Sequence, residues 1–177
     1  MAKPQVPIEV DEDTGIWSVD GMPMILVPRH FFVNLHDAVE AGLGAEATRR
    51  LWWESGRLSA YQWCRKEAAT HGLHGFDVFR HYMKRLSQRG WAQFTILDHD
   101  GATGHTRIGV RHSVFVLHHH GEGERRKLCY PFRGWFVGAL DHVGEALGRP
   151  FGPLASEEIH CAAEGEHDAC LFEVRPA

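Results

Sequence analysis

The residues of this chain best suited to chemistry are its four cysteines, and two of them lie close together near its end. Cys161 and Cys170 flank a polar run from Glu164 to Asp168 that contains Gly165. Glycine and polar residues between two apolar stretches are typical of a tight turn that joins two strands. The predicted hairpin brings Cys161 and Cys170 face to face across its mouth.

A carboxylate and a third thiol extend this pattern. Glu158 lies just upstream, and Cys129 belongs to an earlier element, so four oxygen or sulfur donors can converge. Thiolates and a carboxylate are ligands that Zn²⁺ takes in a tetrahedral arrangement. The spacing is not a Cys-x-x-Cys pair, so two other interpretations stay open. Cys161 and Cys170 form a disulfide, or the cysteines are buried small apolar residues.

The chain carries none of the common catalytic or nucleotide-binding motifs. It has no Gly-x-Gly-x-x-Gly, no P-loop, no Gly-x-Ser-x-Gly and no His-Glu-x-x-His. A catalytic zinc usually keeps three protein ligands and one open position. Four strong ligands close the shell, which favours a structural metal. A site from which Glu158 is displaced is instead Cys₃ with an open position, and the sequence leaves that alternative open.

Composition narrows the class of protein. The chain has 177 residues, of which 44% are hydrophobic and 24% charged, as expected for one soluble domain or one domain with an elaborated end. A net charge of −4 gives no reason to expect nucleic acid. No run reaches the roughly 18 apolar residues of a membrane span, and the first residues do not resemble a signal peptide. We therefore expect a cytoplasmic protein, where disulfides are rare.

The elements that must position the thiols follow from the spacing of apolar residues and glycines. We expect a hairpin within 8–19, a short strand at 24–27, helices at 29–41, 45–70, 75–88 and 132–147, strands at 91–98 and 106–117, and two strands in the tail. Helices followed by an antiparallel meander predict an α+β fold with helices packed on one antiparallel sheet. The run His118-His119-His120 is interpreted as a hairpin tip.

Three of the glycines within the predicted helices are informative. Gly56 lies in mid-helix at a cost of about 1 kcal/mol relative to alanine, which indicates a close neighbour or a ligand. Gly134 and Gly138 are one turn apart, a spacing that permits close approach of another backbone. Trp52, Trp53 and Gly56 are also suited to burial against a second copy of the chain, and we expect a homodimer.

The tail pattern Glu158-x-x-Cys161-x-x-x-Gly165-x-x-x-x-Cys170-x-Phe172-x-Val174 resembles the closing signature of the 4-vinyl reductase domain family. That family includes the sensory domains of aromatic-responsive bacterial regulators and is related to a vesicle-tethering subunit fold. The segment from Cys129 to Gly138 resembles the helix start that precedes this signature. The resemblance covers roughly 43–174 and implies a ligand-binding domain over 43–177. It also implies a structural zinc bound by Cys129, Glu158, Cys161 and Cys170.

Residues 1–42 fall outside the shared domain. They resemble an N-terminal extension of uncharacterised role in a bacterial subgroup whose members accompany enzymes that oxidatively demethylate dimethylglycine-like amines. The resemblance thus implies a zinc-stabilised small-molecule-binding domain with a sensory or accessory role. Two alternatives remain: an enzyme acting on a small one-carbon, amine or vinyl substrate at an open zinc or at His112, and a structural subunit that docks onto a flavoprotein demethylase.

In sensory relatives the ligand pocket lies between the sheet and the helices, beside the zinc. The corresponding candidates here are Trp52, Trp63, Phe94, Phe115, His112 and Tyr130, although aromatic residues also dominate ordinary cores. Alternation along the predicted strand 106–117 puts His112 on the same face as Ile108 and Val110. A buried imidazole needs a hydrogen-bond partner or a ligand. We expect His112 to point inward, toward one of the two.

Overall fold

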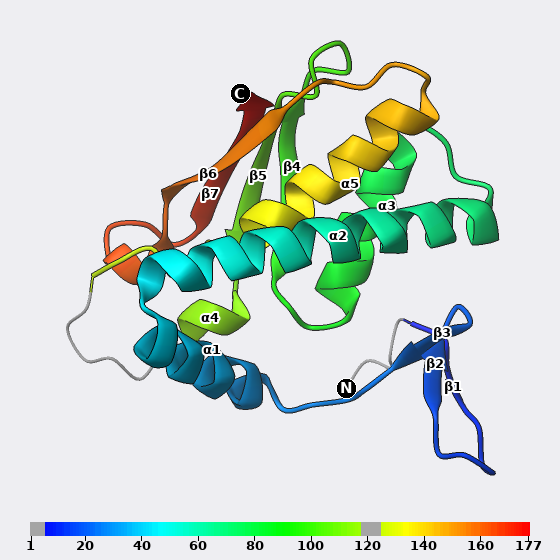
Figure 1. Cartoon of the computed structure of the whole chain (residues 1–177), viewed down its shortest axis with the longest axis horizontal. Coiled ribbons are helices and arrows are strands. Elements are labelled where there is room, and N and C mark those ends of the chain that lie inside the picture. Colours follow the sequence, from blue (N-terminus) through cyan, green and yellow to red (C-terminus); the bar gives the residue numbers. More distant parts are fainter. Residues whose placement is uncertain (1–5, 118–124) are drawn as a thin grey trace.

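A four-stranded antiparallel sheet forms the centre of the molecule in the computed structural model, which describes residues 6–117 and 125–177. Its strands lie in the order β4-β5-β7-β6, with bounds β4 Gln93–His99, β5 Thr106–Arg111, β6 Leu154–His160 and β7 Cys170–Pro176. Alternate residues of β5 and β7, such as Ile108 and Phe172, are fully buried on one face. The opposite face is partly open, because the helices cover only one side (Figure 1).

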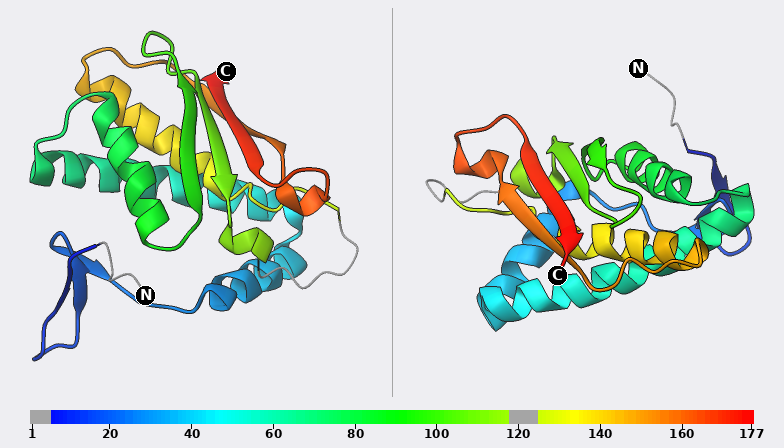
Figure 2. Two further views of the ribbon diagram at one scale, coloured as in Figure 1. Left: turned by 180° about the vertical axis from the view of Figure 1, so that it is seen from behind. Right: turned by 90° about the horizontal axis from the view of Figure 1, so that it is seen from above.

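The helices are α1 (Arg29–Leu43), α2 (Ala45–His71), α3 (Phe76–Gln88), the short α4 (Val114–Leu117) and α5 (Phe132–Ala146). Helix α5 lies against β6 and β7, α3 covers β4, and α2 packs on the outer side of α5 (Figure 2). The predicted α+β class is therefore confirmed. The ends of the four long helices agree with the predicted ranges to within two residues.

Glycines on α5 allow the close contact between α5 and α2. A Cβ atom on Gly134 would lie 2.4 Å from the Trp53 carbonyl oxygen, and one on Gly138 would lie 2.0 Å from the Arg57 carbonyl oxygen. Both distances are shorter than any real contact, so only glycine permits this packing. Gly56 on α2 also permits the close contact, because the Trp135 ring of α5 occupies the space that a side chain at Gly56 would fill. Gly56 is therefore used inside the chain, and is not available for the homodimer contact predicted for it.

The N-terminal residues form a small separate sheet of β1 (Ile8–Val10), β2 (Trp17–Val19) and β3 (Met22–Met24). The predicted hairpin corresponds to β1 and β2. The predicted strand at 24–27 is wrong, since β3 ends at Met24 and tolerates Pro23 because it lies at the edge of the sheet. The following residues Ile25 and Leu26 are each 77% exposed.

The predicted strand 106–117 is also wrong in its second half. β5 ends at Arg111, His112 adopts a left-handed φ of 53°, and Ser113 directly precedes the short helix α4. The Ser113 hydroxyl accepts a hydrogen bond from the Phe115 amide at 3.2 Å, as serine does at the start of many helices. The run 118–120 lies outside the described residues. No helix in the described ranges is both long enough and apolar enough to span a bilayer.

Candidate metal centre and ligand cavity

The four predicted metal ligands come together at the junction of three elements. Cys129 precedes α5, Glu158 lies on β6, Cys161 follows β6, and Cys170 is the first residue of β7. The turn of the β6–β7 hairpin brings the Cys161 and Cys170 sulfur atoms to 3.5 Å, and the Cys170 and Cys129 sulfur atoms are 3.6 Å apart. All four donor atoms lie within 4.8 Å of one another, and all four residues are buried.

These separations fit a tetrahedral zinc ion. With a zinc–sulfur bond of about 2.3 Å, two thiolates of a tetrahedron lie about 3.8 Å apart. The Glu158 carboxylate accepts a hydrogen bond from the Cys129 amide through Oε1 at 3.3 Å. Its other oxygen, Oε2, is buried and has no hydrogen-bond partner within residues 6–117 and 125–177. An orphaned buried carboxylate oxygen beside three thiols is a suitable metal donor.

The ionisation of the cluster also favours a cation. Burial, and then the neighbouring Cys161 sulfur, raise the pKa of Glu158 to about 10. Burial likewise raises the pKa of Cys129 well above its usual range. Hydrogen bonds from the Cys129 and Cys170 thiols lower the pKa of Cys161. The four groups therefore cannot all be ionised together at neutral pH unless a positive charge lies among them.

The structure distinguishes between the alternative interpretations of the cysteines. All four are free thiols, so the disulfide is not formed. Cys64 lies on α2, outside the cluster, where burial raises its pKa. The interpretation of Cys161 and Cys170 as inert apolar fillers conflicts with the polar contacts that both make.

Three of the six predicted ligand-lining residues meet around a histidine that the sequence did not single out. Trp52 donates its indole N–H to His36 Nδ1 at 3.2 Å, and the Tyr130 hydroxyl lies 3.3 Å from His36 Nε2. The Phe115 ring packs edge-on to the His36 ring. Tyr130 also donates to Glu40 at 2.6 Å. This cluster is a hydrogen-bonded part of the core, and its histidine sits in an amphipathic helix where the sequence gave no distinguishing signal.

The other three candidates lie elsewhere. Trp63 packs against Tyr82 on α3, and Phe94 packs edge-on to Phe132 and Phe136. His112 is exposed, which corrects the expectation that it points inward. The physical reason is the left-handed turn at His112, which ends the strand alternation on which that expectation depended. A ligand site built on His112 is therefore not supported.

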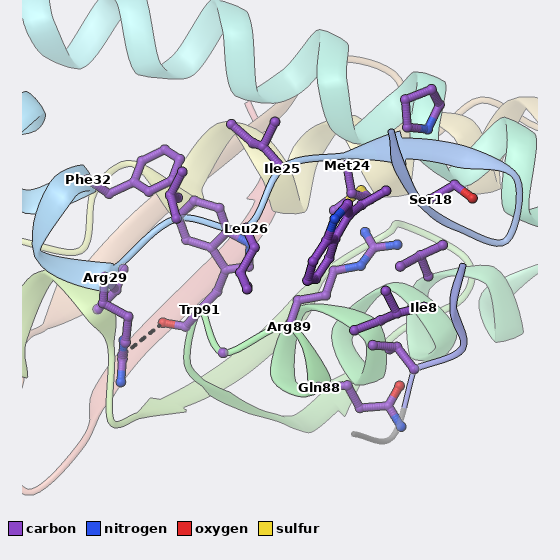
Figure 3. Close-up of a pocket in the computed structure, with 17 residues that line it drawn as sticks. Ile8, Ser18, Met24, Ile25, Leu26, Arg29, Phe32, Gln88, Arg89 and Trp91 are labelled. Atoms are coloured by element: carbon purple, nitrogen blue, oxygen red, sulfur yellow. Dashed lines mark hydrogen bonds between the residues drawn. The ribbon is translucent and has the colours of Figure 1, made fainter. Parts of the chain in front are cut away.

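A cavity of about 410 Å³ lies between the N-terminal sheet and the rest of the molecule (Figure 3). One wall comes from β2, β3 and the segment leading to α1, and the other from the connection between α3 and β4. Its lining is mostly apolar and includes Trp17, Met24, Leu26, Phe32 and Trp91. None of the six predicted ligand residues lines it. Sequence reasoning missed this cavity because its two walls are far apart in the chain.

Two arginines bring charge to this apolar cavity. Arg29 donates to the His112 carbonyl at 2.6 Å, while its Nε is buried. Arg89 extends from the end of α3 toward Met24 in Figure 3, and its Nε and Nη2 are both buried. In the part of the chain that the structure describes, none of these three nitrogen atoms has a hydrogen-bond partner. Its guanidinium lies 5.0 Å from the centroid of the Trp63 ring. Burial lowers the pKa of Arg89, as expected for a cation with unmet donors.

Comparison with known proteins assigns a family to the chain. The family model described as a domain of unknown function, DUF5943, matches residues 2–97, which is more than half of the chain. The chain belongs to this family. The matched region begins within the N-terminal extension and includes both walls of the cavity. No curated protein matches the chain.

Solved structures show the same fold at low sequence identity. The phenol-responsive sensory domain of the transcription activator PoxR, crystallised with phenol, superposes with a TM-score of 0.80 at 17% identity. That match covers 96% of this chain and 84% of the other. A trafficking protein particle complex subunit 3 from Naegleria fowleri, covalently bound to palmitic acid, gives a TM-score of 0.56 at 12% identity over 83% and 93% of the two chains. The expected likeness to a sensory domain is thus found in the fold.

Proposed function

We propose that the chain is a zinc-stabilised small-molecule-binding domain with a sensory or accessory role, and that its ligand occupies the cavity beneath the N-terminal sheet. The observation that carries the proposal is the combination of an apolar cavity with unpartnered guanidinium donors of Arg89. A cavity of a few hundred Å³ with apolar walls and few polar groups is typical of small-molecule sites. The shared fold with a phenol-responsive sensory domain supports the same class of function.

The zinc has a structural part in this proposal. Cys129, Glu158, Cys161 and Cys170 supply four donors and close the coordination shell, as in structural sites. The metal would connect the β6–β7 hairpin to the start of α5. Bound zinc supplies cross-linking and charge neutralisation. The protein residues supply the tetrahedral arrangement and exclude water.

The cavity selects the class of ligand. Trp17, Trp91 and Phe32 offer aromatic surface that favours a flat apolar group. Arg89 offers buried N–H donors, and an unmet buried donor costs on the order of 1–3 kcal/mol. A carboxylate on the ligand would pair with the positive charge of this guanidinium at the cavity wall. We therefore assign an apolar or aromatic carboxylate as the preferred ligand class.

A matched pair of probes tests this assignment. Benzoate and phenol share a ring and differ in the carboxylate, and tryptophan fluorescence or calorimetry reports their binding. The wild-type chain should prefer benzoate. Arg89→Met should weaken benzoate binding by about tenfold or more while leaving phenol binding nearly unchanged. Arg65→Met, at an exposed position of α2, is the control. Absence of binding by both probes, or unchanged benzoate affinity in the Arg89 variant, contradicts the proposal.

A second candidate function is docking onto a flavoprotein demethylase, in line with the resemblance of the N-terminal extension. The observation that favours it is the exposure of Ile25 and Leu26, two large apolar side chains on the segment between β3 and α1. Exposed neighbouring apolar residues are suited to burial by a partner. Co-purification of a flavoprotein with the wild-type chain, lost in an Ile25→Ser, Leu26→Ser variant, is the expected result. Equal recovery with both chains would reject it.

The predicted homodimer remains a separate proposal. Gly56 packs against Trp135 inside the chain, but Trp53 on α2 is only half-buried and its exposed part is suited to contact with a second copy. Light scattering across micromolar concentrations decides it, and a species of 20 kDa throughout would show a monomer.

A further inference from the structure

A second group of metal-type donors lies at the other end of α2. Glu67 and His71 are four residues apart on that helix, so both side chains lie on one face. His81 approaches them from α3. The Glu67 Oε2 atom lies 2.8 Å from His81 Nε2 and 3.4 Å from His71 Nε2. One donor atom from each residue falls within 4.8 Å of the other two.

The central carboxylate of this group has an unmet requirement. The Glu67 side chain is fully buried, and its Oε1 atom has no hydrogen-bond partner among the described residues. A buried carboxylate oxygen without a partner is costly unless a cation or donor reaches it. This is an observation independent of the clustering, because the hydrogen bond to His81 involves only Oε2.

A further carboxylate, from the N-terminal sheet, lies beside His71. Asp20 lies in the turn between β2 and β3, where Asp20 and Gly21 both have positive φ, as in Asp-Gly hairpin turns. Its Oδ1 atom is 3.6 Å from His71 Nε2, and its side chain is only 7% exposed. The turn that closes the small sheet therefore places a carboxylate at the edge of the histidine cluster.

The charges facing the group come from every element around it. Arg85 on α3 contacts Asp20 Oδ2 at 2.8 Å, and its Nε lies 4.0 Å from Glu67 Oε2. The His81 ring stacks on Trp63, with ring centroids 5.7 Å apart. Arg89, which follows α3, also interacts electrostatically with Glu67 and Asp20, so the two arginines together offset much of the charge of the two carboxylates. The His71 side chain is 30% exposed, which gives an ion a path from solvent.

We propose that Glu67, His71 and His81 bind a divalent transition metal of the zinc class and leave one coordination position open. Imidazole nitrogen and carboxylate oxygen are the donors that Zn²⁺ and Co²⁺ accept. With bonds of about 2.0–2.1 Å, tetrahedral donors lie about 3.3 Å apart. The separations of 2.8 and 3.4 Å lie around that value. The metal would fix α2 to α3 beside the β2–β3 turn.

Cobalt distinguishes this site from the cysteine cluster, because thiolate ligands give Co²⁺ an intense charge-transfer absorption and nitrogen and oxygen ligands do not. The metal-free wild-type chain should take up two Co²⁺ ions. His71→Ala and His81→Ala should each lose one ion and keep the charge-transfer band. Cys161→Ser with Cys170→Ser should lose the band and keep the other ion. His74→Ala, an exposed histidine between α2 and α3, should bind two ions.

His71 is exposed, so its alanine variant should fold, and Zn²⁺ should raise the melting temperature of this variant less than that of the wild type. Two Co²⁺ ions in the His71→Ala variant, or one thiolate-bound ion in the wild type, would overturn the proposal. If His81→Ala proves unfolded, the His71→Ala result decides alone.

Discussion

The two donor clusters differ in how their charge is balanced. Cys129, Glu158, Cys161 and Cys170 are all potential anions, all buried, and held between a hairpin and the start of α5. The Glu67 cluster contains two imidazoles, lies beside the guanidinium of Arg85, and is accessible to solvent at His71. The first cluster requires a cation to ionise, whereas the second is partly neutralised by its own residues. The convergence of donor atoms alone therefore does not determine how much a bound metal stabilises the fold.

The largest expected effect is the loss of stability when the cysteine cluster is removed. Replacing Cys161 and Cys170 by serine should remove its metal and much of the stability of the domain, because binding of a structural zinc contributes on the order of 10 kcal/mol to folding. Circular dichroism melting with metal analysis measures both changes. Chelation of the wild-type chain should give at least this loss, because it also removes a metal from the Glu67 cluster. Full zinc occupancy in the double variant would show that these thiols are not ligands.

The next effect concerns the contact between α2 and α5. The cysteine cluster lies at the start of α5, and the Glu67 cluster lies near the end of α2. Gly138→Ala would place a methyl group against the Arg57 carbonyl, and we expect a loss of about 1–3 kcal/mol of unfolding free energy or more. Gly42→Ala is the matched control, since Gly42 lies in α1 with no atom within 4 Å of the added Cβ. There alanine should stabilise the helix by up to about 1 kcal/mol. Denaturant unfolding compares the two, and equal stability would contradict the close packing.

The smallest effect is a pH dependence that belongs to neither cluster. Burial, with Arg80 nearby, lowers the pKa of His99, whose ring stacks on Phe76. The unfolded chain therefore binds a proton that the folded chain does not, and stability falls as pH drops below the ordinary histidine pKa of about 6.5. His99→Gln should flatten that part of the stability profile in metal-free protein. An unchanged slope of stability against pH would show that other groups cause this pH dependence. The pH dependence of the metal-free protein must be subtracted before the release of metal at low pH is interpreted.

Local spacing was sufficient where neighbours in sequence are neighbours in space. The polar run between Cys161 and Cys170 predicted the hairpin and its paired thiols, and Gly134 and Gly138 predicted a close helix contact. The α+β class followed from the order of the elements. Residue types also nominated Glu158, although its convergence with Cys129 depended on elements 29 residues apart.

Only the tertiary structure decided the rest. Alternation placed His112 inward, but a left-handed turn at that residue ended the strand and exposed it. Glu67, His71 and His81 are ordinary surface-type residues on two helices, and only the packing of α2 against α3 brings their donor atoms together. The cavity likewise needs residues near 17, 29 and 89 at once. Periodicity reports which face a residue lies on within one element, whereas a site shared by several elements depends on how they pack.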